Sequence, residues 1–265
     1  MDISFGFIGT GNMGGALARA AVKGGVKAVL FDKAAEKAQA LAQELGCQAG
    51  SLKEAAACNY IFLGVKPQMM AGLFEELAPI LAKRQDGFVL VSMAAGIPIA
   101  DIRALAGKDY PVIRIMPNIP VAAGSGVIMY APTENVSSEA LEAFCAAMGA
   151  AGHLDRLPEN LIDAGSAISG CGPAFAALFI EALADGGVAC GLPRDKAMDY
   201  AAWMLAGTAK MLSETKMHPG AMKDAVCAPG GSTIAGVQAL EEGAFRAAAS
   251  NAVLAAYRRT KELGK

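Results

Sequence analysis

The sequence predicts an α/β fold, a doubly wound parallel sheet followed by an all-helical region. Over roughly the first 130 residues, short apolar runs alternate with helical stretches. These runs are continuously apolar, which is typical of strands covered on both faces. Beyond Leu157 and Pro158 we find no convincing strand, and Gly and Pro separate successive helical stretches. We therefore expect a sheet domain over residues 1–157 and a helical domain over residues 158–265.

The elements follow in chain order. A first strand ends at Ile8, and a helix over roughly residues 12–24 comes next. Further strands are expected at 27–31, 60–65, 88–93 and 111–116, with an edge strand at 126–130 and a short strand near His153. Helices of the first domain are expected at 34–45, after Ser51, at 68–82 and at 137–149. Helices of the second domain are expected at 159–168, 173–190, 194–214, 218–226, 231–241 and 243–262.

Composition and charge exclude several classes of protein. The 265 residues carry a formal net charge of −2, which gives no basic surface for nucleic acid. The most apolar long stretch, residues 174–191, is interrupted by Glu181 and Asp185, so we expect no membrane span. No signal peptide is visible, and six scattered cysteines without a C-x-x-C pair favour a reduced, cytoplasmic protein. Two histidines without clustered ligands indicate no metal site.

A glycine-rich turn joins the first strand to the first helix. Gly9 suits the tight bend, Gly11 lets the backbone approach a diphosphate, and Gly14 lets the helix pack close to the strand. Asp32, which ends the second strand, is placed to bind a ribose. We interpret this segment as a dinucleotide-binding turn, and the alternative is a glycine turn in another kind of α/β protein. The expected dinucleotide-binding residues here are Ile8, Gly9, Thr10, Gly11, Asn12, Met13, Gly14, Asp32 and Lys33.

Three further loops follow successive strands on the same expected edge of the sheet. They contain Gly64-Val65-Lys66-Pro67, Met93-Ala94-Ala95-Gly96 and Met116-Pro117-Asn118. The small residues at 94–96 suit a backbone lying against a flat nicotinamide ring. Ordinary turns are the alternative for any one loop, but three in a row favour a binding function.

The helical domain contains one distinctive loop, Cys227-Ala-Pro-Gly-Gly-Ser-Thr-Ile234. The exposed N–H groups of Gly230, Gly231 and Ser232 at a helix start suit a carboxylate. The hydroxyls of Ser232 and Thr233 can either cap the helix or meet a ligand, and composition alone leaves both interpretations open.

Other polar residues give weaker indications. Glu181 and Asp185 are four residues apart on one helix and are interpreted as a polar stripe rather than as a catalytic pair. His153 and His218 have no acidic or nucleophilic neighbour in the sequence. Cys171 lies in a glycine-rich segment but lacks an activating base.

Together these motifs resemble the pyrroline-5-carboxylate reductase family over essentially the whole chain. The matching segments are Gly6–Gly14, Val65–Pro67, Ala94–Gly96, Met116–Asn118, Ser169–Phe175 and, most specifically, Asp224–Ile234 followed by Leu240-Glu241.

The resemblance implies a Rossmann domain that binds NADPH or NADH, and a helical dimerisation domain that interlocks with a second subunit in a homo-dimer or higher homo-oligomer. It also implies that Gly230, Gly231 and Ser232 hold the substrate carboxylate. Thr233 would hydrogen-bond the ring nitrogen, and Asn118 is counted with the substrate-binding residues. The expected reaction is hydride transfer to the imine carbon of 1-pyrroline-5-carboxylate, which gives L-proline.

The chain departs from the family pattern at several positions. Ala228 and Cys171 replace usual serines, Ile119 replaces a usual threonine, and Ser51 stands near where an asparagine often meets the ribose. Asp32 favours NADH because it would repel a 2′-phosphate, whereas Lys33 could instead pair with that phosphate. The preference between the two cofactors therefore stays open.

Two other functions remain as alternatives. A 3-hydroxy-acid dehydrogenase of the Rossmann-plus-helices kind relies on a lysine in the interdomain helix, and residues 173–190 contain none. A non-catalytic dinucleotide sensor would share the fold. Such a sensor, however, does not need a carboxylate-binding loop.

Overall fold

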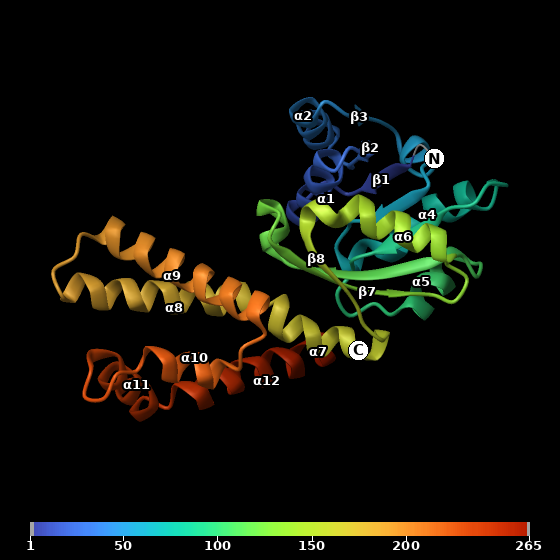
Figure 1. The fold of residues 1–265 in the computed structure, drawn as a ribbon. Coiled ribbons are helices and arrows are strands. Elements are labelled where there is room, and N and C mark those ends of the chain that lie inside the picture. Colours follow the sequence, from blue (N-terminus) through green and yellow to red (C-terminus); the bar gives the residue numbers. More distant parts are fainter. Residues whose placement is uncertain (1–2, 264–265) are drawn as a thin grey trace. The chain divides into compact units, whose positions relative to one another are not determined.

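The computed structural model describes residues 3–263 and divides into two compact units (Figure 1). Unit 1 runs to Cys171 and includes the stretch from Ala256 onward, and unit 2 comprises Gly172–Ala255. The expected boundary at residues 157 and 158 marks the change from strands to helices. The compact units divide later in the chain because the next helix packs on the sheet through Ile162, which is fully buried.

Unit 1 is built on one eight-stranded sheet with the order β3-β2-β1-β4-β5-β6-β7-β8. Strands β1 to β6 are parallel, β7 is antiparallel to β6, and β8 is parallel to β7. The strands are β1 Ser4–Ile8, β2 Lys27–Phe31, β3 Gln48–Ala49, β4 Tyr60–Leu63, β5 Val89–Ser92, β6 Val112–Pro117, β7 Gly126–Pro132 and β8 Gly152–Arg156. The expectation that residues 126–130 form an edge was wrong, because β8 pairs with β7 and becomes the edge.

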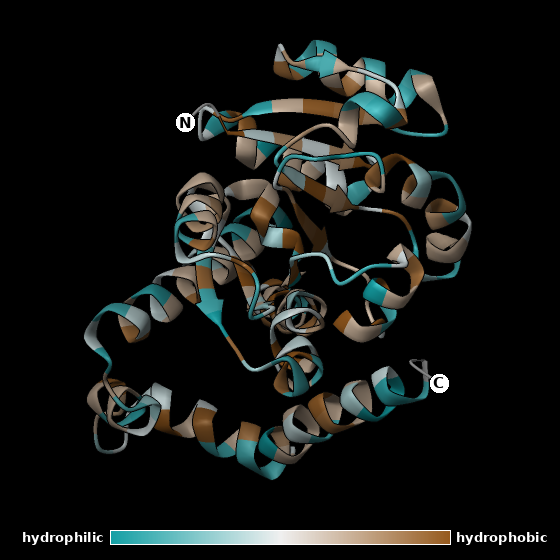
Figure 2. Ribbon diagram, turned by 90° about the vertical axis from the view of Figure 1, so that its right-hand side faces the viewer, coloured by the Kyte–Doolittle hydropathy of each residue, from teal (hydrophilic) through white to brown (hydrophobic). Residues whose placement is uncertain are grey.

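Helices cover both faces of this sheet. On β4, Tyr60 and Phe62 face a core shared with α1 and α6, while Ile61 and Leu63 face a core shared with α4 and α5. This alternation explains the continuous apolar runs, and Figure 2 shows them as brown strands. The helices are α1 Asn12–Lys23, α2 Ala35–Leu45, α3 Leu52–Ala55, η1 Pro67–Met69, α4 Met70–Leu81, α5 Ile99–Ala106, η2 Ile119–Ala123, α6 Ser138–Met148, η3 Gly149–Ala151 and α7 Glu159–Ser169.

Unit 2 contains only helices among its described residues. These are α8 Gly172–Ala189, α9 Arg194–Thr215, α10 Pro219–Val226, α11 Ser232–Glu242 and most of α12 Phe245–Leu263. α8 and α9 lie side by side (Figure 1), and Gly187 allows their close approach, because an added Cβ would lie 3.2 Å from Cβ of Ala197.

Many apolar side chains of unit 2 are exposed, including Leu178, Tyr200, Trp203 and Val226. By length and composition alone, the stretch Glu159–Ala189 could cross a membrane, with a mean hydropathy of 1.6 and only 11% of its apolar window buried. A globular helix bundle rarely leaves so much apolar surface uncovered, so this surface indicates a partner.

Candidate functional site

The carboxyl ends of β1 and β4 meet at the point where the strand order reverses. Here the loops after the two strands touch: a Cβ added to Gly9 would lie 2.7 Å from the carbonyl carbon of Gly64. Gly9 also has φ +99°, a conformation that favours glycine. A Cβ on Gly14 would lie 2.2 Å from the Gly9 oxygen. Packing therefore fixes the glycines at 9, 14 and 64.

Gly11 is different from these three glycines. Its φ of −65° suits any residue, and an added Cβ would meet no described heavy atom within 4 Å. It is the N-cap of α1, and the first turn of that helix has no acidic residue and no side-chain cap. The free N–H groups and the positive end of the helix dipole therefore face open space, an arrangement that fits a diphosphate.

Asp32 lies beside this turn, at the end of β2. Its carboxylate accepts hydrogen bonds from Thr10 N at 2.8 Å, Thr10 Oγ1 at 3.1 Å and Ala34 N at 3.0 Å. Burial raises the pKa of Asp32, but these hydrogen bonds outweigh it and hold the pKa below its ordinary value. The group is thus a fixed negative charge at the position expected for ribose binding.

The other expected cofactor residues lie at the same edge. Lys66 is exposed at the N-cap of η1, and the loop Met93–Gly96 follows β5, with Ala94 buried and Gly96 at φ +76°. Lys33 is exposed and pairs with Glu76 at 3.7 Å. Ser51 caps α3 in a capping box and donates its hydroxyl to Glu54 Oε2 at 2.7 Å, so that hydrogen is already used.

Asn118 follows β6, but its side chain is buried and occupied. Its Oδ1 accepts from Val127 N at 2.8 Å, and its Nδ2 donates to the Ser169 carbonyl at 3.0 Å. These bonds fasten the start of β7 and the end of α7 to the end of β6. The neighbouring Ile119, by contrast, is exposed.

The loop before α11 lies in unit 2 and forms a tight turn. Gly231 N donates to Ala228 O at 3.0 Å, with Pro229 and Gly230 between them and φ +68° at Gly230. These are features of a type II turn. Ser232 and Thr233 are exposed, and neither hydroxyl has a hydrogen-bond partner in the described chain. Capping therefore does not account for the two hydroxyls, which are open to solvent and to a ligand.

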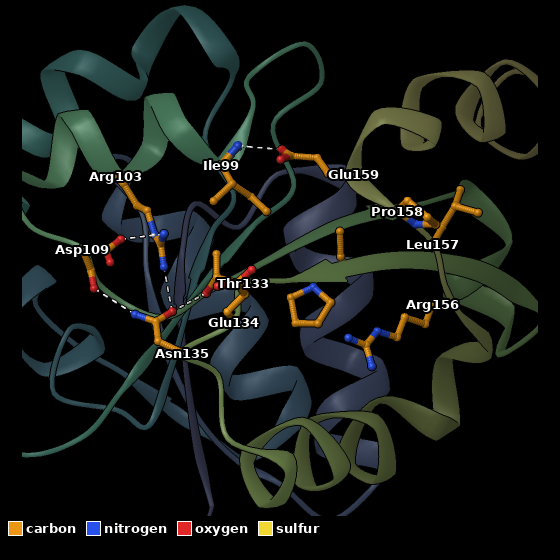
Figure 3. Close-up of a pocket in the computed structure, with 12 residues that line it drawn as sticks. Ile99, Arg103, Asp109, Thr133, Glu134, Asn135, Arg156, Leu157, Pro158 and Glu159 are labelled. Carbon is orange, nitrogen blue, oxygen red and sulfur yellow. Dashed lines mark hydrogen bonds and ion pairs between the residues drawn. The ribbon is translucent and has the colours of Figure 1, made fainter.

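A cavity of about 770 Å³ lies in unit 1, between α5, the end of β7 and the start of α7 (Figure 3). None of its twelve lining residues is among the expected site residues. Two of its charged groups already serve the fold, since Arg103 pairs with Asp109 at 2.6 Å and donates to Asn135 at 2.7 Å.

Sequence reasoning missed one buried charge near the site, Arg114 on β6. It lies in the apolar run over residues 111–116, where a lone arginine needs partners. An arginine inside an apolar run is therefore the sequence signal from which this buried charge could have been predicted. Its partners, Glu159 and Asp163, lie 45 and 49 residues further along the chain.

Comparisons with known proteins agree with this arrangement. A family model described as "NADP oxidoreductase coenzyme F420-dependent" matches residues 4–96, and one described as "Pyrroline-5-carboxylate reductase dimerisation" matches residues 159–263. The pyrroline-5-carboxylate reductase of Glycine max is 39% identical over 98% of this chain and 96% of its own length. That of Escherichia coli is 34% identical over the full length of both chains.

Solved structures give the same result. The Plasmodium falciparum pyrroline carboxylate reductase with NADP bound has a TM-score of 0.87 and 29% identity, covering 99% of this chain and 100% of that one.

Proposed function

The chain belongs to the pyrroline-5-carboxylate reductase family, and we propose which of its residues perform that family's reaction. It is an oxidoreductase that reduces 1-pyrroline-5-carboxylate to L-proline with NADPH or NADH. The 3-hydroxy-acid dehydrogenase and the dinucleotide sensor considered from the sequence are thereby excluded. The roles of individual residues are our proposal.

We assign the cofactor to the carboxyl edge of β1, β2, β4 and β5. The turn at Gly9–Gly14 would hold the diphosphate, and Asp32 would accept hydrogen bonds from the adenosine ribose. The loops Gly64–Pro67 and Met93–Gly96 would line the remainder of the cofactor. When bound, the cofactor supplies a hydride from its nicotinamide ring. Ser51 is proposed as a ribose contact only through its oxygen, because its hydrogen is given to Glu54.

We assign the substrate carboxylate to the turn at Gly230–Ser232. The main-chain N–H groups of Gly230 and Ser232 would make charge-assisted hydrogen bonds to the carboxylate and so orient the ring, since that of Gly231 is donated to Ala228 within the turn. Thr233, one residue further, would hold the ring nitrogen through its hydroxyl. The protonated imine accepts hydride readily because its carbon is electron-poor, so no strong general acid is required of the protein. Asn118 is proposed to position the loop after β6 rather than to contact substrate, because both ends of its amide are bonded.

The observation that carries the substrate assignment is the pair of unpartnered hydroxyls beside the type II turn. The test follows loss of NADH or NADPH absorbance with pyrroline-5-carboxylate. Thr233→Ala should lower kcat/KM about 10- to 100-fold, as expected for loss of one hydrogen bond at the reacting group. Thr233→Ser should retain most activity, and Thr208→Ala on α9 serves as the control. If Thr233→Ala matches the wild type, Thr233 has no role in the reaction.

The assembly follows from the helices of unit 2. The chain forms a homo-oligomer, and we propose that the exposed apolar faces of these helices make its dimer interface. We further propose a cytoplasmic location, which the six free thiols support.

A further inference from the structure

Arg114 is a buried cation in the middle of the otherwise apolar strand β6. Its side chain is 4% exposed, on the face of β6 that also carries Val112 and Met116. Nη1 lies 3.2 Å from Glu159 Oε1, and Nη2 lies 3.0 Å from Asp163 Oδ1. Both partners are on α7, and Nε has no partner among the described residues. Both ion pairs of Arg114 are therefore made with the same helix.

The face of α7 that meets β6 is built for this contact. Glu159, Ile162 and Asp163 have the spacing of one helix face, and Ile162 is fully buried in the apolar core that includes Val112 and Met116. Glu159 Oε1 also accepts from Ile99 N at 2.7 Å, at the first turn of α5 (Figure 3). This bond ties α7 to the helix that directly follows the loop Met93–Gly96.

The same cluster holds the last helix of the chain. Lys261 Nζ on α12 donates to Asp163 Oδ2 at 2.9 Å. At the other end of α7, Asn118 donates to the Ser169 carbonyl. Arg114 lies within β6, and Asn118 directly follows that strand. The start and the end of α7 are therefore fastened to the same strand.

These fastened helices are the two places where the chain passes between the units. It leaves unit 1 after α7, between Cys171 and Gly172, and returns within α12, between Ala255 and Ala256. A buried arginine with no task beyond stability could be replaced by an apolar residue together with its partners at little cost, so its presence here favours a specific geometric role.

We propose that Arg114 is a positioning residue, which fixes the directions of α7 and α12 where the chain leaves and re-enters unit 1. The inference rests on the proposed function, in which unit 2 carries the substrate-binding turn and unit 1 carries the cofactor-binding edge. Arg114 touches neither ligand. It acts on the reaction through the helices that join the two sets of binding residues.

The test compares Arg114→Met with the wild type in three measurements. The KM for pyrroline-5-carboxylate should rise about 10- to 100-fold, the range expected when substrate is misplaced by about 1 Å. The dissociation constant of NADH, titrated by fluorescence in the absence of substrate, should stay unchanged. Amide hydrogen exchange should become faster in α7 and in α12 beyond Ala255, but not in β1 or β4.

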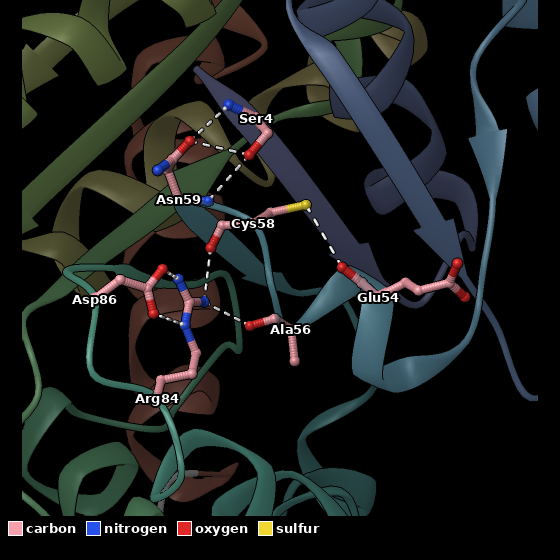
Figure 4. A network of polar contacts seen from close by, with 7 residues as sticks. All are labelled: Ser4, Glu54, Ala56, Cys58, Asn59, Arg84 and Asp86. Atoms are coloured by element: carbon pink, nitrogen blue, oxygen red, sulfur yellow. Dashed lines mark hydrogen bonds and ion pairs between the residues drawn. The ribbon is translucent and has the colours of Figure 1, made fainter. Parts of the chain in front are cut away.

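Arg84 provides a matched control. It is also nearly buried, with a side chain 9% exposed, and it donates to the carbonyls of Ala56 and Cys58 while pairing with Asp86 at 2.6 Å (Figure 4). These contacts lie at the amino edge of the sheet. Arg84→Met should therefore lower the unfolding temperature without raising the substrate KM or the exchange of α7.

Two milder variants cover the case in which Arg114→Met does not fold. Arg114→Lys retains the charge but not the forked geometry. Its KM for the substrate should therefore lie between those of the wild type and Arg114→Met. Lys261→Met removes the α12 contact alone and should speed exchange only in α12.

The proposal is overturned if Arg84→Met raises KM as much as Arg114→Met does. It is equally overturned if none of the Arg114 and Lys261 variants alters exchange in α7 or α12. A wild-type protein that fails to reduce the imine would instead contradict the proposed function, and the exchange data would still decide the role of Arg114.

Discussion

Asp32 holds the turn after β1, and we propose that the same side chain selects the cofactor. Its three hydrogen bonds to Thr10 and Ala34 hold the carboxylate in place before any cofactor binds. Because its pKa is held below the ordinary value, it stays charged at neutral pH. A fixed negative charge beside a ribose favours a free 2′-hydroxyl over a 2′-phosphate, so we propose that NADH is at least competitive with NADPH.

We predict that Asp32→Ser moves the ratio of kcat/KM values toward NADPH by about tenfold, as for removal of a contact costing about 1.4 kcal/mol. Steady-state kinetics with both cofactors measures this ratio. Lys33→Ala is the companion variant. If Lys33 binds the 2′-phosphate, that change should weaken NADPH alone. A ratio that Asp32→Ser leaves unaltered would show that Asp32 does not select the cofactor.

At the scale of elements, the turn between β1 and α1 contains two kinds of glycine. Gly9 and Gly14 are required by packing, whereas Gly11 faces open space and is proposed to face the diphosphate. A Cβ at position 14 would press on the Gly9 oxygen, whereas one at position 11 would enter open space. Gly14→Ala should therefore lower the free energy of unfolding by about 1–3 kcal/mol. Gly11→Ala should lower it by no more than about 1 kcal/mol.

For cofactor binding, the order of the two effects should be reversed, with Gly11→Ala the more damaging substitution. Gly11→Ala should raise the NADH dissociation constant about tenfold or more, because its methyl group occupies the approach of the diphosphate. Urea unfolding and fluorescence titration measure the two effects. Equal loss of stability in both variants would mean that Gly11, too, is a packing glycine.

The elements also show how far sequence reasoning reached. The strands other than β3, the glycine turn and the helices of unit 2 followed from apolar runs and from Gly and Pro. Helix α5 was missed, since its eight residues between Pro98 and Gly107 are too short for a clear period. The antiparallel direction of β7 was not predicted because an apolar run carries no direction. Asn118 shows why the role of a site residue is harder to predict than an element. Its partner Ser169 lies 51 residues away, so local sequence does not reveal that its amide is already bonded.

The contact of α7 with β6 predicts a pH dependence of stability. Burial raises the pKa of Asp163, but the hydrogen bond from Lys261 and the charge of Arg114 outweigh it, so the folded-state pKa is lowered. A lowered pKa adds stability above the unfolded value and loses it as pH falls through the folded value.

We therefore expect Asp163→Asn to be less stable than the wild type at pH 7. The difference should begin to shrink as pH falls below about 4, the ordinary value of an unfolded aspartate, and should be lost as pH falls through the lower pKa of the folded protein. Urea unfolding across this range measures it, with Asp155→Asn, on an exposed position of β8, as the control. A difference that stays constant with pH would contradict the assignment.

At the scale of the whole molecule, the two units bury their apolar residues differently. Unit 1 encloses two cores around its sheet, and the helices of unit 2 leave large apolar side chains uncovered. Trp203 on α9 is 75% exposed and is the sole tryptophan of the chain. Aromatic side chains of this kind carry much of the binding energy of protein interfaces, commonly about 2 kcal/mol or more each. We therefore propose that association through unit 2 completes a core that one chain lacks.

Trp203 consequently reports on assembly as well as contributing to it. On concentration, the fluorescence of the wild type should shift to shorter wavelength as the indole becomes buried. Trp203→Lys should weaken the dimer about 30-fold or more, equivalent to about 2 kcal/mol, as measured by sedimentation equilibrium. Lys210→Ala on the same helix should leave assembly intact. A wild type that is dimeric while its indole stays solvent-exposed would place the interface elsewhere on unit 2, because a residue outside the contact reports no burial.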